Sequence, residues 1–308
     1  MPTELRGLPA ASPAAFLAAC GLMRVLGQDL DLPVRLGWHQ GYAVLAGIEP
    51  DALLQALVEH IQGRHLALEF NWSATTRKVS PERFRQTCTQ AAEAGDERAL
   101  GFMAGWGCDA VLRPDAADPS QLYITPTALD LTSGQQALIK NLQDLAKRLQ
   151  APAVAKEAFT IACFGGDYAN DQSAFGLDPA TQRRRATGYE SPTGKKPSAK
   201  PGWVWLFAES IPMHPVLPQS DGRATTAGVS KGYFWPIWQG WLNWQELTAL
   251  RALPQAMLTE LTGVKEIWHA RKVVNGKYGT LLPAVRIPLA NAATSQAATL
   301  ASVTSLVP

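Results

Sequence analysis

The sequence has no long apolar run, no paired cysteines and no motif of a common enzyme class. No stretch approaches about 18 uninterrupted apolar residues, which argues against a membrane-spanning helix. Cys20, Cys88, Cys108 and Cys163 form no C-x-x-C pair, so a structural zinc site is not expected, and free thiols favour a reducing compartment. We therefore expect a cytoplasmic protein that needs no metal ion and no other cofactor.

Motifs that bind nucleotides or hold catalytic groups are missing as well. The sequence contains no G-x-x-x-x-G-K-[ST] loop, no G-x-G-x-x-G after a strand, no H-E-x-x-H and no G-x-S-x-G. Asp167 and Asp171 in GGDYAND are four residues apart, a spacing more typical of a turn than of a metal site. The five histidines are far apart in sequence: His39, His60, His65, His214 and His269. Nothing in these residues points to catalysis.

Charged residues are scarce, at 18% of the chain against about 25% in typical domains. Lys and Arg number 28 against 26 Asp and Glu, so the formal net charge is only +2. Total charge therefore does not indicate a nucleic-acid binder. The 308 residues, 46% of them hydrophobic, suffice for a large core in one domain or two smaller ones.

The apolar pattern predicts helices and strands without strict alternation. Ser12-Pro13 and Ser80-Pro81 are typical helix starts, because Ser caps the first turn and Pro fits its first position. We predict helices over 13–28, 51–61, from 81 onward, 133–149 and 245–262, and strands over 34–38, 42–48, 66–70, 122–131, 203–217 and 264–289. This mixture favours an α+β fold with a mixed antiparallel sheet and helices, and no doubly wound Rossmann pattern.

Composition divides the chain into four regions. Residues 1–165 read as an N-terminal α+β region, and residues 203–289 as a Trp-rich β/α region. Between them, residues 166–202 are basic and rich in Gly, Ser, Thr and Pro, which predicts a flexible loop. Residues 290–308 form a tail, expected to be disordered or a short helix. The regions can equally form one integrated domain.

Three clusters of basic residues are the clearest functional signal. Residues 77–85 carry a net charge of +3, residues 183–200 carry +5 and residues 264–286 carry +4. Residues 91–130, in contrast, hold seven acidic residues against two basic ones. Such segregation gives a nearly neutral protein a phosphate-binding face beside a protein-binding face. Taken singly, each cluster is explained equally well as a solvated surface.

We predict nucleic-acid contacts from these clusters, from Lys231 and from two glutamines. Of the three clusters, the one with the arginines at 183–185 most favours a phosphate-binding arm, because a guanidinium group can donate two parallel hydrogen bonds to the oxygens of one phosphate. The glutamines would lie in the first turn of a helix capped by Thr132 or Ser133, where free N–H groups bind anions; an ordinary capped helix is the alternative. The predicted residues are Arg77, Lys78, Arg83, Arg85, Gln135, Gln136, Arg183, Arg184, Arg185, Lys195, Lys196, Lys200, Lys231, Arg271, Lys272 and Lys277.

Four of the ten tryptophans, Trp235, Trp238, Trp241 and Trp244, recur every three residues. We expect Trp235 and Trp238 to be core residues, because their neighbours in the sequence are apolar. Trp241 and Trp244 have polar neighbours, and one of them is expected to face a partner. A stacking platform for unpaired bases is the alternative.

Five segments carry a resemblance to one protein family; in chain order they read SPAAFLAACGLMRVL, SATTRKVSPERFR, TALDLTSGQQALI, ESIPMHPVLP and TTAGVSKGYFWPIW. Over residues 12–250 the chain is similar to large-subunit-like or associated accessory proteins of type I-G (formerly I-U) CRISPR effector complexes. The resemblance implies a non-catalytic subunit of a Cascade-like DNA surveillance complex in antiviral defence. Its implied partners are other effector subunits, guide RNA, target DNA and a helicase-nuclease. Because many large subunits are much longer, a reduced version or an accessory module is implied.

Two other functions stay open. A guide-processing RNA endonuclease of the same complex needs a general base near a 2′-hydroxyl, and His39 or His214 would supply it. A scaffold would instead dock a protein on the tryptophan cluster, and its basic residues would only be solvated.

Overall fold

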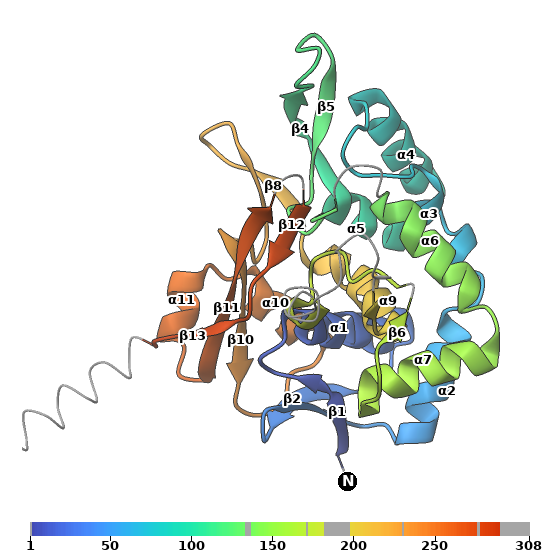
Figure 1. Cartoon of the computed structure of the whole chain (residues 1–308), viewed down its shortest axis with the longest axis vertical. Coiled ribbons are helices and arrows are strands. Elements are labelled where there is room, and N and C mark those ends of the chain that lie inside the picture. The colour runs from blue at the N-terminus through green and yellow to red at the C-terminus, as the bar shows by residue number, and fades with distance from the viewer. Residues whose placement is uncertain are drawn as a thin grey trace, which may run out of the picture.

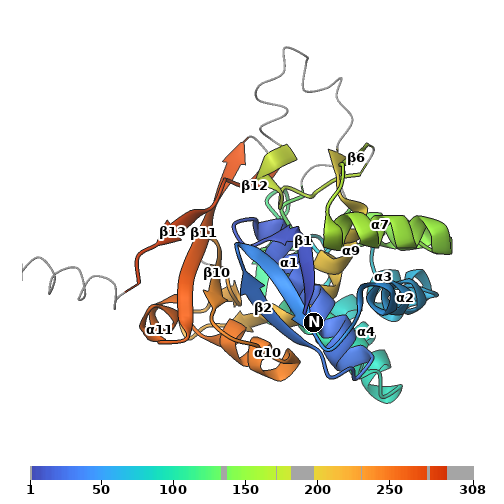
Figure 2. The ribbon, with the colours of Figure 1, turned by 90° about the horizontal axis from the view of Figure 1, so that it is seen from below.

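Two helices, α1 and α9, form the centre of the molecule. The computed structural model describes residues 2–132, 137–170, 172–181, 198–229, 231–275 and 278–289. The central pair lies between a sheet of β10 to β13 on one side and the helices α2, α3, α6 and α7 on the other (Figure 1). Seen from below, β1 and β2 lie against α1 (Figure 2). The described helices are α1 (Pro13–Arg24), α2 (Pro50–His60), α3 (Leu68–Asn71), α4 (Pro81–Glu93), α5 (Glu97–Trp106), α6 (Leu138–Arg148), α7 (Pro152–Phe164), α9 (Pro201–Ser210), α10 (Trp244–Ala252) and α11 (Gln255–Glu260).

The described strands pair in small antiparallel sheets. They are β1 (Thr3–Pro9), β2 (Arg35–His39), β3 (Tyr42–Ala46), β4 (Gly107–Pro114), β5 (Leu122–Pro126), β6 (Ala169–Asn170), β7 (Ser198–Ala199), β8 (Val216–Pro218), β9 (Ala224–Thr226), β10 (Gly232–Trp238), β11 (Val264–Asn275), β12 (Tyr278–Leu281) and β13 (Val285–Ile287). One sheet has the order β1-β3-β2, and another the order β10-β11-β12 with β13 also on β11. The remaining strands form the hairpins β4–β5, β6–β7 and β8–β9. The predicted α+β class without a Rossmann pattern is confirmed.

The central helix α1 begins as the sequence predicts. The Ser12 side chain accepts a hydrogen bond from the backbone N–H of Ala15 at 3.3 Å, and Pro13 occupies the first helical position. All twelve residues of α1 are buried. A Cβ atom at Gly21 would overlap the carbonyl oxygen of Leu206, so this glycine permits the close crossing of α1 and α9.

One hydrophobic core extends through most of the fold. It runs from Leu5 to Leu281 and takes side chains from both of the regions predicted over 1–165 and 203–289. A smaller cluster joins α11 to β10 and β11. The two regions therefore share one core. Among the described residues, no helix combines the length and apolar character that crossing a bilayer requires.

Two segments predicted as strands are helical. Residues 203–217 form most of α9 and the 3₁₀ turn Ile211–Met213, and only β8 is a strand. Because α9 is buried on all sides, its sequence carries no 3.6-residue polar period that would reveal a helix. Residues 66–70 form the end of a 3₁₀ turn and most of α3.

Two predicted helices have other boundaries. The helix predicted over 133–149 begins at Leu138 in the described part of the chain, after Ala137 as its N-cap. The helix predicted over 245–262 is two helices, α10 and α11, which separate at Leu253-Pro254. The separation follows from the proline, because the residue before a proline disfavours helical backbone angles.

Candidate nucleic-acid interface

A groove between β9 and β11 gathers three cationic side chains. Lys231, Arg271 and Lys272 line it together with hydroxyl and apolar side chains, and its volume is about 540 Å³. The register of the sheet brings the three together. Gly232 on β10 pairs with Arg271 on β11, and the backbone N–H of Lys272 donates to the carbonyl of Lys231 at 3.2 Å. We call Lys231, Arg271 and Lys272 the basic groove.

One cation of the sequence cluster over 77–85, Arg77, acts on the basic groove. Burial lowers the pKa of Lys272, and the positive charge of Arg77 lowers it further. Arg113 donates to the backbone carbonyl of Arg77 at 3.2 Å. Arg77 from the cluster over 77–85 therefore adds positive potential to Lys272 from the cluster over 264–286, while the negative charge of Asp130 partly offsets it.

Asp130 fixes the position of Arg77 beside the groove. Its carboxylate lies 3.6 Å from Nε of Arg77, while Nη2 of Arg77 donates to the Asp130 carbonyl at 3.3 Å. The same carboxylate accepts hydrogen bonds from the hydroxyls of Thr76 and Thr132. Asp130 is buried and its oxygens are engaged. Lys231 and Arg271 are exposed, and no carboxylate of the described residues forms an ion pair with either.

Three further predicted residues lie outside the basic groove. Lys78 pairs with Asp115 at 2.5 Å, and Arg85 pairs with Asp109 at 2.6 Å. Arg83 donates two hydrogen bonds, of 3.0 and 2.9 Å, to a backbone carbonyl of the chain. Their positive charges are therefore already partnered within the fold, in contrast to those of Lys231 and Arg271.

Lys200 is buried, contrary to its predicted contact with phosphates. Only 9% of its surface is exposed. Its Nζ atom lies 4.5 Å from the ring centre of Trp203 and 5.6 Å from that of Tyr168. Burial lowers the pKa of this amine. We therefore remove Lys200 from the candidate interface, because its side chain packs on Trp203 of α9 and on Tyr168.

Half of the predicted contacts cannot be placed by the described residues. Thr132 does not cap α6, since its hydroxyl donates to Asp130 and the N-cap of that helix is Ala137. The residues that lie outside the described ranges are Gln135, Gln136, Arg183, Arg184, Arg185, Lys195, Lys196 and Lys277. Their nucleic-acid contacts stay predictions.

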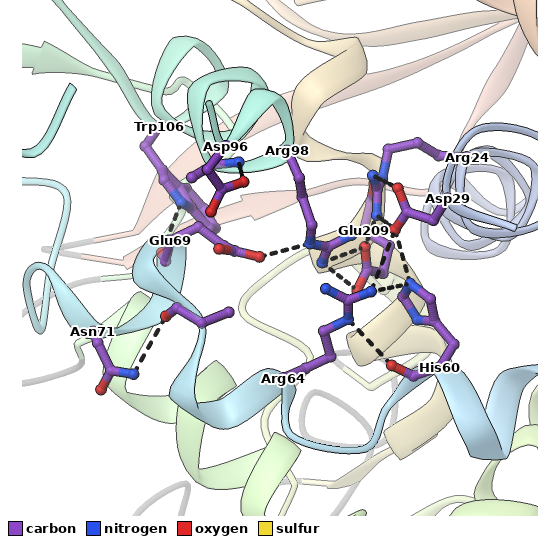
Figure 3. A network of polar contacts seen from close by, with 12 residues as sticks. Arg24, Asp29, His60, Arg64, Glu69, Asn71, Asp96, Arg98, Trp106 and Glu209 are labelled. Carbon is purple, nitrogen blue, oxygen red and sulfur yellow. Dashed lines mark hydrogen bonds and ion pairs between the residues drawn. The ribbon is translucent and has the colours of Figure 1, made fainter. Parts of the chain in front are cut away.

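A second polar cluster lies in the interior, and no sequence motif pointed to it. Its members come from segments that are far apart in the chain: Arg24, Asp29, His60, Arg64, Glu69, Arg98 and Glu209 (Figure 3). Arg98 donates to Glu69 at 2.7 Å and to Glu209 at 2.9 Å, and Arg24 pairs with Asp29 at 2.9 Å and with Glu209. We call this set the buried charge network.

A π-helical turn brings one carboxylate into the network. The turn, Val25–Asp29, follows α1 directly and places Asp29 2.8 Å from Nε2 of His60. Asp29, His60 and Glu209 offer ligand atoms within 4.8 Å of one another, a spacing that suits a metal ion. The guanidinium groups of Arg24 and Arg98 already bind these carboxylates, and their positive charges oppose a further cation. The network therefore fits a structural role that joins α1, α5 and α9.

The arginines keep the buried carboxylates ionised. Burial alone would raise the pKa of Glu209, but the charges of Arg98 and Arg24 lower it to about 2. The pKa of Asp29 is likewise held well below its usual range, against burial, by a hydrogen bond to His60 and by Arg24 and Arg98. Three arginines thus face three carboxylates, and the network is close to neutral.

The two histidines considered as general bases differ in exposure. His214 is fully buried, and burial together with the charge of Arg251 lowers its pKa to about 3. It is neutral and out of reach of an RNA 2′-hydroxyl, so it is removed as a candidate. His39 is exposed on β2 and lines a recess with Trp38 and Trp241.

The tryptophan cluster divides between core and surface. Trp235 is fully buried, and its indole N–H donates to the carbonyl of Ala10 at 2.8 Å. Trp238 is buried as well, whereas Trp241 is 38% exposed. The predicted core positions of Trp235 and Trp238 and the wetter position of Trp241 are confirmed.

No protein-family model matches the sequence, and no curated protein sequence matches it either. Neither comparison therefore supports the resemblance over residues 12–250, which stays a prediction.

Proposed function

We propose that this protein is a cytoplasmic, non-catalytic subunit of a CRISPR RNA-guided DNA surveillance complex, and that its basic groove contacts nucleic-acid phosphates. The resemblance over residues 12–250 to proteins of type I-G CRISPR effector complexes supports the assignment to a CRISPR system. The partners would be the other effector subunits, the guide RNA, the target DNA and the helicase-nuclease. The observation that carries the nucleic-acid contact is the meeting of Lys231, Arg271 and Lys272 in one groove beside Arg77.

The basic groove suits a phosphate backbone for an electrostatic reason. Lys231 and Arg271 are exposed and have no carboxylate partner among the described residues, so a phosphate does not have to displace one. The carboxylate that holds Arg77 beside the groove, that of Asp130, is buried and already accepts several hydrogen bonds. Binding there releases counterions from the nucleic acid, which favours association at low salt.

The salt dependence of DNA binding tests this proposal. We expect the double variant Lys231→Gln/Arg271→Gln, assembled with guide RNA and the other subunits, to bind duplex DNA with a flatter dependence of log K on log salt. Each lost phosphate contact changes the slope by about 0.9, so the slope should flatten by about 2. Affinity is measured by fluorescence anisotropy over a range of salt concentrations.

A matched variant removes the same charge elsewhere. Lys78→Gln/Arg85→Gln also deletes two exposed cations, but both are paired with carboxylates outside the basic groove. Its slope should equal that of the parent. Equal slopes for the groove variant and the parent would disprove the phosphate contact. Equal flattening of the slope by both double variants would show that net charge alone, and not a contact in the basic groove, changes the slope.

A further inference from the structure

A surface of opposite character lies away from the basic groove. Two adjoining recesses share Pro2 and Glu4. Their lining residues include Glu4, Glu49, Asp51, Trp38, His39 and Trp241, which we call the acidic-aromatic groove, and Phe164 adds a further aromatic ring to the recess of Glu49. The strands β1 and β2, which contribute to it, lie at the lower end of Figure 1, whereas β4, β5 and β8 lie towards the upper end.

The aromatic part of this groove is held in place by the fold. A Cβ atom at Gly37 would stand 3.1 Å from the Trp241 ring, so glycine at this position lets the indole lie close against β2. Trp38 stacks on the core residue Phe16 with ring centroids 5.8 Å apart. Trp241 nevertheless remains 38% exposed, which makes its ring accessible to an occupant.

The charged part of the groove is acidic and largely unpartnered. Glu49 and Asp51 stand at the start of α2, and no cation of the described residues forms an ion pair with either. Glu4 pairs with the exposed Arg6 at 2.9 Å. Neither recess has a lysine or arginine among its described lining residues. Carboxylates in this position repel phosphates, which disfavours a nucleic acid in spite of the accessible indole.

We propose that the acidic-aromatic groove binds an arginine- or lysine-bearing segment of a partner protein. A cation over an indole face is attracted by the ring quadrupole, and arginine also stacks on the ring. Glu4 offers matching negative charge in the same recess as Trp241, and Glu49 and Asp51 offer more in the adjoining recess. Electrostatic complementarity of this kind steers partners and fixes their register. The inference needs neither the basic groove nor the CRISPR assignment.

Binding of short peptides to the full chain tests the inference. The probe is a fluorescein-labelled peptide of alternating arginine and proline, followed by fluorescence anisotropy at low salt. The purification tag is removed or placed at the C-terminal end, because Pro2 lines the groove. We expect Trp241→Ala and the double variant Glu49→Gln/Asp51→Asn to weaken binding at least tenfold each.

Matched controls separate a groove from general attraction to an acidic surface. Glu93→Gln/Glu157→Gln removes the same charge from exposed positions on α4 and α7 and should bind like the parent. If Trp241→Ala unfolds the protein, Glu49→Gln/Asp51→Asn still tests the groove, because both substituted side chains lie at the surface.

Three results would overturn the inference. They are the absence of peptide binding by the parent, equal weakening by Glu93→Gln/Glu157→Gln, and Trp241-dependent binding of single-stranded DNA or of a glutamate–proline peptide. The salt slope of DNA binding by the complex should stay unchanged in Trp241→Ala. A negative result for peptide binding at the acidic-aromatic groove therefore does not affect the salt-dependence test of the basic groove. The reverse holds as well.

Discussion

Replacing Glu209 with glutamine is expected to destabilise the fold by about 3–5 kcal/mol at pH 7. Glutamine has nearly the size of glutamate, so the substitution creates no cavity. The Glu209 carboxylate is fully buried and binds both Arg98, at 2.9 and 3.0 Å, and Arg24. Without its charge, two buried guanidinium groups lose a counter-ion that water cannot replace.

The same carboxylate makes the stability of the parent protein depend on pH. The ordinary pKa of this group is 4.5, and in the folded protein it is about 2. A difference of this size corresponds to about 3 kcal/mol. Because the folded-state pKa is the lower one, this stabilisation is complete above about pH 5 and is lost as the pH falls towards 2. The lowered pKa of Asp29 acts in the same direction.

Urea unfolding followed by tryptophan fluorescence at pH 7 and pH 3 measures both effects. The glutamine variant should be less stable at pH 7 and should lose less additional stability at pH 3 than the parent. Asp109→Asn is the control, because it breaks an exposed pair with Arg85 and should cost less than about 1 kcal/mol. If Glu209→Gln and the parent unfold at the same urea concentration at pH 7, the reasoning about the buried charge network is wrong.

Two further predictions concern stability and are checked by thermal melting. Trp235→Ala should cost about 3–5 kcal/mol, because the side chain is fully buried, whereas Trp241→Ala should cost clearly less because its ring is 38% exposed. Similar melting temperatures for the two variants would contradict the assignment of core and surface. Gly228 and Gly222 have nearly equal positive φ angles, 78° and 77°, but a Cβ at Gly228 would overlap Nη2 of Arg251, while Gly222 has open space. Gly222→Ala should therefore cost only about 1 kcal/mol of backbone strain and Gly228→Ala clearly more; equal losses would show that Arg251 moves aside freely.

Features encoded by neighbouring residues were predictable from the sequence. Ser80 accepts a hydrogen bond from the N–H of Arg83 at 3.2 Å, as its place before a proline indicates. The strands predicted over 34–38 and 42–48 form as β2 and β3, and they are joined by Gln40 and Gly41 at φ angles of 49° and 81°. Both angles suit the tight turn that joins two antiparallel strands.

The sites depend on residues that are distant in the sequence, and therefore escaped prediction. Lys231 and Lys272 meet only because β10 and β11 pair in one register. Arg24 and Glu209 are 185 residues apart, and nothing local marks either as part of a network. The α9 helix was missed for a related reason: complete burial removes the polar face from which a helix is recognised.

The close crossing of α1 with α9 has a consequence for biosynthesis. The nascent chain exposes α1 early, but its partner α9 follows only after the intervening residues have been made. At about 5–20 residues per second, that interval lasts about 10–40 s. During it the twelve residues of α1, all buried in the finished protein, have no native surface to cover them. The packing of α1 therefore has to wait until Ser210 at the end of α9 has been made, and until then the apolar side chains of α1 are a site where a nascent chain can aggregate.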